Sequence, residues 1–375
     1  MAVTHHMEVT ILYFAAASTA TNLNSEIVGI PTDRPFLLSE LGDLLVSLHP
    51  DTGLDKVLES KDVPSVHTAQ AVTPSPNSSA FIASRLTPTT FLIKEYDDIY
   101  SEKPHIYAKL IQQLSTIIIL DTGCGGHSSN PDVEIKELRE FLETVGIEDN
   151  GGRPLNEGGR MKYIIILSHC HYDHILAVEQ FSDSMILASG YSPEFLRPSR
   201  LPVHSLCQEL GIETPSYSPT LVDHMHQVLS SDGKKTSITI MHTPGHTPDE
   251  LAVYDGDEKM LYVGDTLYEN APIIFPKEGS IIDWMETIDE LISFVGDQES
   301  QNGSVVRINA GHETAAQPAL EVLTATKAFM EDVLRGREAV QRRWTKRGEE
   351  TVMYEQDGKR FSLICPERLV VEARR

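Results

Sequence analysis

The sequence predicts an α/β protein in which a small N-terminal unit precedes a larger domain. Two observations lead to this class. From Phe81 onward, short runs of apolar and β-branched residues, which are typical of strands, alternate with segments whose apolar residues recur every three or four positions, as in helices. Polar clusters also follow directly after several predicted strands, where α/β folds often carry their functional side chains. A chain of 375 residues is long enough for two such units.

The first 70 residues predict a β-β-α order. Strands are expected at residues 8–15 and 26–30, and the leucines between residues 38 and 48 share one face of a predicted helix. This order resembles the first half of a ubiquitin-like sulfur carrier of the MoaD type, a family whose chains end in an exposed Gly-Gly. Here a linker rich in proline and serine follows instead, at residues 71–80. We therefore expect a structural extension at 1–70, with a sulfur-carrier or binding role as the alternative, and the main domain at 81–375.

The elements of the main domain are predicted from the same periodicities. The fully apolar run at residues 163–167, for example, predicts a strand that is buried on both faces. The expected order is strands at 81–86, 89–95, 106–111 and 116–120, a helix at 133–145, strands at 163–167, 185–189, 237–242, 251–255 and 259–264, a helix at 283–295, a strand at 305–310 and a long helix at 318–343.

Composition narrows the possible functions. The chain has 31 Lys and Arg against 55 Asp and Glu, and the resulting net charge of −24 disfavours binding to nucleic acid. No run of about 18 apolar residues predicts a membrane span. The four cysteines are scattered and form no CxxC pair, which is typical of a reduced protein. We expect a cytoplasmic protein with a small-molecule substrate.

The densest functional signal follows the predicted strand at 163–167. The segment SHCHYDH places His169, His171, Asp173 and His174 within six residues. Imidazole and carboxylate groups at this density suit a divalent metal ion. Alternation along an extended segment lets His169 and His171 face one ion, whereas Asp173 and His174, at the turn into a helix, can face a second ion.

Four further candidate ligands stand at the ends of other predicted strands. Each of them alone could be an ordinary turn residue. Their common position after a strand indicates that they converge with the SHCHYDH segment. They are Asp121, His246, Asp265 and His312.

With these motifs in this order, the chain resembles the metallo-β-lactamase superfamily over residues 80–375. The resemblance implies an αββα sandwich with two metal ions at one rim, and we expect two Zn²⁺ per chain. It also implies that His169, His171 and His246 hold one ion, that Asp173, His174 and His312 hold the other, that Asp265 bridges them, and that Asp121 orients a ligand from behind.

Details of the motifs separate the branches of this superfamily. The mono-cysteine β-lactamases carry Cys at the position of Asp265 and lack His174, and the flavodiiron proteins carry Glu at the position of His171. Too few residues separate Asp265 from His312 for the extra domain of the RNA-cutting branch. The net charge disfavours the tRNA-processing branch. The usual glycines after the DH pair are replaced by residues 175–177, Ile-Leu-Ala.

Once these branches are excluded, a lactonase, a lactamase or a thioesterase remains, and Tyr268 favours the first two. It stands three residues after Asp265, where N-acyl homoserine lactone lactonases carry a tyrosine that contacts the substrate carbonyl. The resemblance thus implies a lactam or lactone hydrolase, in which Tyr268 donates a hydrogen bond to the developing oxyanion. A hydroxide between the two zinc ions would attack the carbonyl, and Asp265 or Asp173 would carry the proton to the leaving group.

Several alternatives stay open. A thioesterase similar to glyoxalase II has nearly the same motifs and would use basic residues near the C-terminus, such as Lys346 and Arg347. An oxygenase with a single iron ion is a further rival. His224 and His226 repeat the spacing of metal ligands but follow no buried strand, so we expect them to be loop residues.

Overall fold

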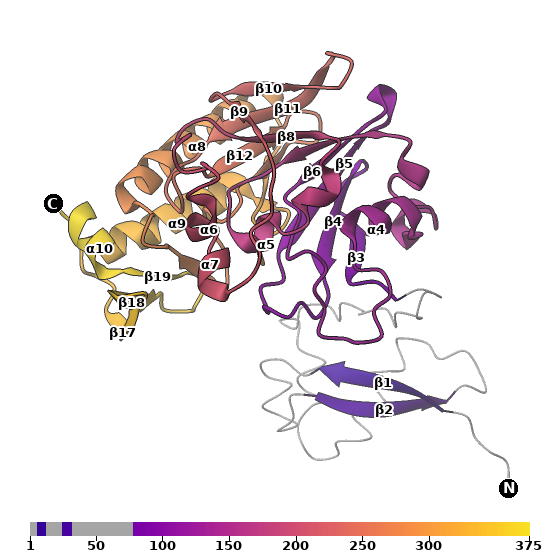
Figure 1. The fold of residues 1–375 in the computed structure, drawn as a ribbon. Helices are drawn as coiled ribbons and strands as arrows, with labels where there is room; N and C mark the ends of the chain where they lie inside the picture. The colour runs from indigo at the N-terminus through magenta and orange to yellow at the C-terminus, as the bar shows by residue number, and fades with distance from the viewer. Residues whose placement is uncertain (1–5, 13–24, 32–77) are drawn as a thin grey trace, which may run out of the picture. The chain divides into compact units, whose positions relative to one another are not determined.

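The computed structural model describes residues 6–12, 25–31 and 78–375 (Figure 1). The chain divides into two compact units, Met1–Pro76 and Asn77–Arg375. In the first unit, β1 (His6–Leu12) pairs antiparallel with β2 (Ser25–Pro31), which places two strands where the sequence predicts them. The helix predicted near residue 40 and the linker lie outside the described residues.

The second unit contains two large sheets, of which the first has seven strands. Its first four strands pair antiparallel, and the next three continue the sheet in parallel, so that the carboxyl ends of β6 to β9 lie along one edge. In order, the strands are β3 (Phe81–Arg85), β4 (Thr90–Glu95), β5 (His105–Ile111), β6 (Thr116–Leu120), β7 (Lys162–Ile166), β8 (Met185–Ser189) and β9 (Thr220–Val222).

The second large sheet has six strands. The first four pair antiparallel, whereas β13 and β15 pair in parallel, which requires a crossover that includes α8 (Ile281–Asn302). In order, the strands are β10 (His226–Leu229), β11 (Lys235–His242), β12 (Leu251–Asp255), β13 (Met260–Tyr262), β15 (Arg307–Asn309) and β16 (Gln317–Pro318).

The two sheets pack face to face between two layers of helices (Figure 1). One apolar cluster joins the sheets and includes Ile166 and Ile240. A second cluster packs Phe141 of α4 (Leu138–Thr144) on the outer face of the seven-stranded sheet. A third packs Trp284 of α8 and Phe329 of α9 (Ala319–Leu334) on the six-stranded sheet. Each such fully buried side chain stabilises the fold by about 1.5–3 kcal/mol. The predicted αββα sandwich is confirmed.

Helix α8 begins and ends at clear capping residues. The Ser280 hydroxyl accepts a hydrogen bond from the backbone N–H of Asp283 at 3.2 Å, and Gly303 ends the helix with a φ of 64°. The helix is longer than the predicted segment at 283–295 because the polar residues after Val295 continue it. Helix α4 is shorter than predicted, since it begins only at Leu138.

The prediction of a long C-terminal helix at 318–343 is wrong for the second half of that segment. Helix α9 ends at Leu334, and Gly336, with a φ of 71°, donates its backbone N–H to the carbonyl of Val333. The chain then forms a third sheet in the order β14-β19-β18-β17, which the sequence did not predict. Its elements are β14 (Pro272–Ile274), β17 (Val340–Lys346), β18 (Glu349–Glu355) and β19 (Ser362–Pro366), and α10 (Glu367–Ala373) follows it. In the described parts of the chain, no helix is long and apolar enough to cross a membrane.

We propose that the main domain folds without the N-terminal extension. Every candidate ligand lies in the second unit, at residue 121 or beyond. A chain that starts at residue 77 is therefore expected to keep its metal content and its cooperative thermal unfolding. Elemental analysis and circular dichroism would check this result, and a truncated chain that loses either property would contradict the proposed boundary.

Candidate metal centre

The candidate ligands meet because several strands end at the same edge of the sandwich. Strands β11 and β13 both pair antiparallel with β12, so they run in the same direction, and β15 runs parallel to β13. Their carboxyl ends therefore lie together. The segments after these three strands carry His246, Asp265 and His312. In the other sheet, the segment after β7 carries His169, His171, Asp173 and His174, and Asp121 follows β6.

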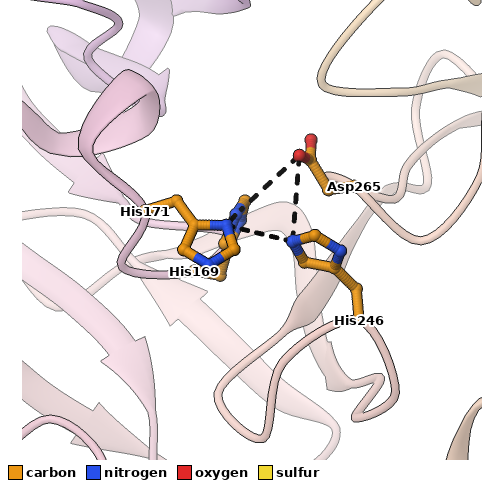
Figure 2. Close-up of side chains that lie close together, drawn as sticks. All are labelled: His169, His171, His246 and Asp265. Carbon is orange, nitrogen blue, oxygen red and sulfur yellow. Dashed lines mark hydrogen bonds and ion pairs between the residues drawn. The ribbon is translucent and has the colours of Figure 1, made fainter. Parts of the chain in front are cut away.

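The first group consists of His169, His171, His246 and Asp265, all of which are buried (Figure 2). The Nδ1 atom of His171 lies 2.9 Å from Nε2 of His169 and 3.1 Å from Nε2 of His246. The Oδ2 atom of Asp265 lies 3.9 Å from each of those two Nε2 atoms. Three imidazoles and one carboxylate thus direct one atom each at a common point.

The second group consists of Asp173, His174, His312 and again Asp265. The Nε2 atom of His174 lies 3.5 Å from Oδ2 of Asp173 and 3.3 Å from Oδ1 of Asp265. The Nε2 atom of His312 lies 3.3 Å and 3.7 Å from the same two oxygens. Asp265 therefore gives one carboxylate oxygen to each group.

Both groups fit a divalent metal ion. Four ligands at about 2.0–2.1 Å around a tetrahedral ion lie about 3.3–3.4 Å from one another, and the distances above bracket that value. In addition, Nε2 of His174 and Oδ1 of Asp265 are buried without a hydrogen-bond partner among the described residues. Buried polar atoms rarely stay unpaired, and a bound cation would satisfy both.

Hydrogen bonds from behind fix how the imidazoles point. The Nδ1 atom of His174 lies 2.9 Å from Oδ2 of Asp121. The Nδ1–H of His246 donates to the carbonyl of Ile274 at 2.6 Å, and that of His312 donates to the carbonyl of Glu102 at 2.9 Å. In each case Nδ1 faces a hydrogen-bond partner and Nε2 faces the centre, which is the usual arrangement behind metal-binding histidines.

Asp121 connects the ends of two strands. It adopts a φ of 61° directly after β6, and its carboxylate accepts hydrogen bonds from the Ser168 backbone N–H at 2.7 Å and the Ser168 hydroxyl at 2.8 Å. The same carboxylate contacts His174, as described above. The structure thus places Asp121 behind the candidate ligands.

Glu250 also supports the centre, and the sequence did not reveal it. Its side chain is fully buried, Oε1 accepts the backbone N–H of Asp265 at 3.0 Å, and Oε2 lies 3.5 Å from Nδ1 of His169. Burial, together with the nearby Asp265 carboxylate, raises the pKa of Glu250 well above its usual range. A Cβ atom at Gly264 would lie 2.1 Å from Oε1 of Glu250, so only glycine fits there.

The electrostatic environment leaves the first group ready to bind a cation. Burial lowers the pKa of His171 to about 3 and that of His169 well below its usual range, so both imidazoles are neutral and keep a free lone pair. Burial opposes charge on His312 as well, but the Asp265 and Asp173 carboxylates together outweigh it and raise the pKa of His312 to about 9. A metal ion would displace that proton.

Tyr268 lies beside the second group. Its ring is buried in the cluster under α8 and meets the ring of His312 edge-on, with 5.5 Å between the ring centroids. Burial raises the pKa of the Tyr268 hydroxyl, and the negative charge of the nearby Asp265 carboxylate raises it further. The phenol therefore stays protonated beside the second group.

Other residues of the region lie outside both groups. His226 is part of β10, and Nδ1 of His224 accepts the backbone N–H of His242 at 3.1 Å. Cys170, between two candidate ligands, packs in a small apolar cluster with Ala188 and Phe195. The seven candidates from the sequence come together, and these histidines stay apart.

Comparison with known proteins identifies one matching family model and several related proteins. Residues 110–300 match the family model of the metallo-β-lactamase superfamily. A protein from Aspergillus versicolor that is named putative transcription factor avaE is 32% identical over 313 residues, which cover 80% of this chain and 90% of that protein. The human acyl-coenzyme A thioesterase MBLAC2 is 24% identical over 209 residues, which cover 52% of this chain and 68% of that enzyme.

Among solved structures, a metallo-β-lactamase family protein from Thermus thermophilus superimposes with a TM-score of 0.50 at 18% identity. The match covers 70% of this chain and 86% of that protein. At this level of identity the likeness shows the fold alone, and it agrees with the αββα arrangement of the two sheets.

Proposed function

The chain belongs to the metallo-β-lactamase superfamily, and on that premise we propose that it is a hydrolase that uses two metal ions, most suitably zinc, to cleave a small carbonyl substrate. One observation carries the proposal: Asp265 directs its two carboxylate oxygens at two separate groups of histidine and aspartate ligands. A bridging carboxylate of this kind suits a pair of ions better than one ion.

The residues of the chain would divide the chemistry as follows. His169, His171 and His246 would hold one ion, and Asp173, His174 and His312 the other. Two such ions would polarise the substrate carbonyl. They would also lower the pKa of a water molecule, so that it could attack as hydroxide at neutral pH. Asp173 and Asp265 carry the only carboxylates of these groups, and they would take up the proton and return it to the leaving group.

A thioester is the substrate class that we propose first. The human relative is named an acyl-coenzyme A thioesterase. Arg347, one of the two basic residues considered for a glutathione thioester, forms an ion pair with Glu209 at 2.6 Å. A lactone or lactam is the second candidate, because the Tyr268 ring still borders His312.

A substrate panel tests this proposal. The metal-loaded protein would be assayed with acyl-coenzyme A thioesters, a glutathione thioester, N-acyl homoserine lactones and β-lactams. We expect release of free thiol from the acyl thioesters at rates that the metal-free protein does not reach. Opening of a lactone or lactam with every thioester left intact would favour the second candidate. No hydrolysis of any substrate by the loaded protein would contradict the function itself.

The metal content is expected to approach two ions per chain. Seven ligand positions, arranged as three, three and one shared carboxylate, provide for two ions, and imidazole and carboxylate ligands suit zinc. Elemental analysis of the purified protein would measure both the identity and the number of ions. One iron ion per chain and no zinc would contradict the dinuclear zinc proposal and favour the oxygenase alternative.

Replacing Tyr268 with phenylalanine is expected to leave the metal content unchanged and to lower turnover. The loss should stay below the roughly 10²–10³-fold that removal of an oxyanion donor usually causes, because a metal ion would share the same oxygen. Steady-state kinetics and elemental analysis would measure both effects. Tyr254→Phe removes a hydroxyl from the same apolar cluster and serves as the matched control. If both variants keep full turnover, Tyr268 only packs.

A further inference from the structure

A groove runs along α8. It consists of a cavity of about 300 Å³ and an adjoining one of about 210 Å³, which share His224, His242, Thr287 and Glu290. None of the seven candidate ligands lines either cavity. We call this region the α8 groove.

The α8 groove combines apolar and acidic side chains. Its apolar lining comes from strand β11, from the turn before β10 and from α8, and includes Met225, Met241 and Phe294. The acidic side chains all come from α8. They are Asp283, Glu286, Glu290 and Asp297.

These four carboxylates share one face of the helix and lack a cationic partner. They are spaced three, four and seven residues apart, so they form a single stripe. Like charges at such spacings destabilise a helix, and Glu286 and Glu290 are four residues apart. Asp289, elsewhere on the same helix, pairs with Lys327. Across residues 78–375, by contrast, no lysine, arginine or histidine nitrogen forms an ion pair with any of the four.

A second observation points to a missing ligand. The hydroxyl oxygen of Thr243, a residue that lines the groove, is buried and has no hydrogen-bond partner within the described ranges. Thr243 is only 2% exposed, and a buried hydroxyl without a partner is unfavourable. The two histidines of the groove bring no positive charge that would balance the stripe. His224 accepts a hydrogen bond on Nδ1, and burial lowers the pKa of His242.

We propose that the α8 groove binds a small organic polyamine, in which methylene segments separate two or more ammonium groups. The ammonium groups would pair with the carboxylate stripe, and one N–H would donate to the Thr243 hydroxyl. The methylene segments would lie against Met225, Met241 and Phe294. This site is independent of the proposed hydrolase activity.

Two other occupants fit less well. A divalent metal ion needs several ligand atoms close together, and the groups of the described residues that meet this condition are the two at the metal centre. A basic peptide needs a longer and more open surface, whereas about 300 Å³ matches the lower end of pockets for small molecules. Methylene segments also explain why apolar side chains line an acidic groove.

Calorimetric titration of spermidine into the full-length, metal-loaded protein tests the proposal. We expect saturable binding of one molecule per chain that weakens as salt is added. The double variant Glu286→Gln/Glu290→Gln should bind about tenfold more weakly, since two ion pairs are lost. Thr243→Val keeps the side-chain shape and should weaken binding about threefold through one lost hydrogen bond.

Matched controls separate this site from general attraction to an acidic protein. Glu134→Gln/Glu140→Gln removes the same charge from exposed positions in and near α4 and should bind spermidine as the unaltered protein does. Equal weakening in both double variants would overturn the proposal, and so would the absence of saturable binding. Tighter binding of tetralysine or of Mg²⁺ than of spermidine would also overturn it, in favour of a peptide or a metal ion.

Discussion

Replacing His171 with alanine is expected to remove bound metal and to abolish nearly all hydrolysis. The Nδ1 atom of His171 lies within 3.1 Å of both other imidazole nitrogens of its group, so its loss leaves two histidines and one carboxylate oxygen. Even a partner behind a metal ligand typically contributes 10–100-fold to affinity or activity. A direct ligand should contribute more, so turnover should fall by more than about 100-fold.

His224→Ala is the matched control for this variant. His224 repeats the local spacing of a ligand, but its Nδ1 atom accepts a backbone hydrogen bond from His242 and it belongs to neither donor group. It should keep full metal content and full turnover. Elemental analysis and steady-state kinetics on both variants would measure the difference. Similar losses in the two variants would mean that the strand-end position does not distinguish a ligand from a loop histidine.

The candidate centre was largely predictable because its members follow strands. Parallel strands of a sheet end at the same edge, so residues that are far apart in sequence, such as Asp265 and His312, meet once β13 and β15 pair. The resemblance to the metallo-β-lactamase superfamily then implied how the ligands group around two ions. Glu250 escaped notice because it precedes its strand. Glu250 lies directly before β12. Because β12 runs antiparallel to β11 and β13, the beginning of β12 lies beside the carboxyl ends of those two strands.

The C-terminal sheet was harder to predict, for a different reason. The segment Val340–Lys346 is mostly polar and exposed, so the alternation that marks a half-buried strand is absent from β17. Its partners supply the pairing, since β18 contributes buried residues such as Val352 and Tyr354. The one local signal was Gly336, which ends α9. Pairing with neighbouring strands, rather than the local sequence pattern, therefore determines that this segment forms a strand.

Replacing Gly311 with alanine is expected to disrupt the metal centre although no ligand residue is changed. A Cβ atom at this position would lie 2.3 Å from Oδ1 of Asp265 and 2.8 Å from Cε1 of His174. The backbone cannot retreat easily, because the Gly311 N–H donates to the carbonyl of Gly264 at 2.6 Å and its own carbonyl accepts the N–H of His105 at 2.7 Å. The displacement must therefore fall on Asp265 or His174.

We expect this variant to lose the second metal ion, which Asp173, His174 and His312 would hold, before the first. Asp265 and His174 both belong to the group that contains Asp173, whereas three histidines still face the first ion. Metal content should thus drop from about two ions toward one, and turnover by about 100-fold, the size of effect that a misplacement of 1 Å can cause. Elemental analysis combined with kinetics would separate loss of an ion from loss of activity at constant metal.

Gly296→Ala provides the control for the added methyl group. Gly296 lies in the interior of α8, and no atom is near the position of its Cβ. Alanine there should stabilise the helix by up to about 1 kcal/mol and leave metal content unchanged. If Gly311→Ala also kept two ions and full turnover, the Asp265 carboxylate would not need to hold its position between the two groups. The dinuclear arrangement would then lose the observation on which it rests, while the histidine group around His171 could still bind a single ion.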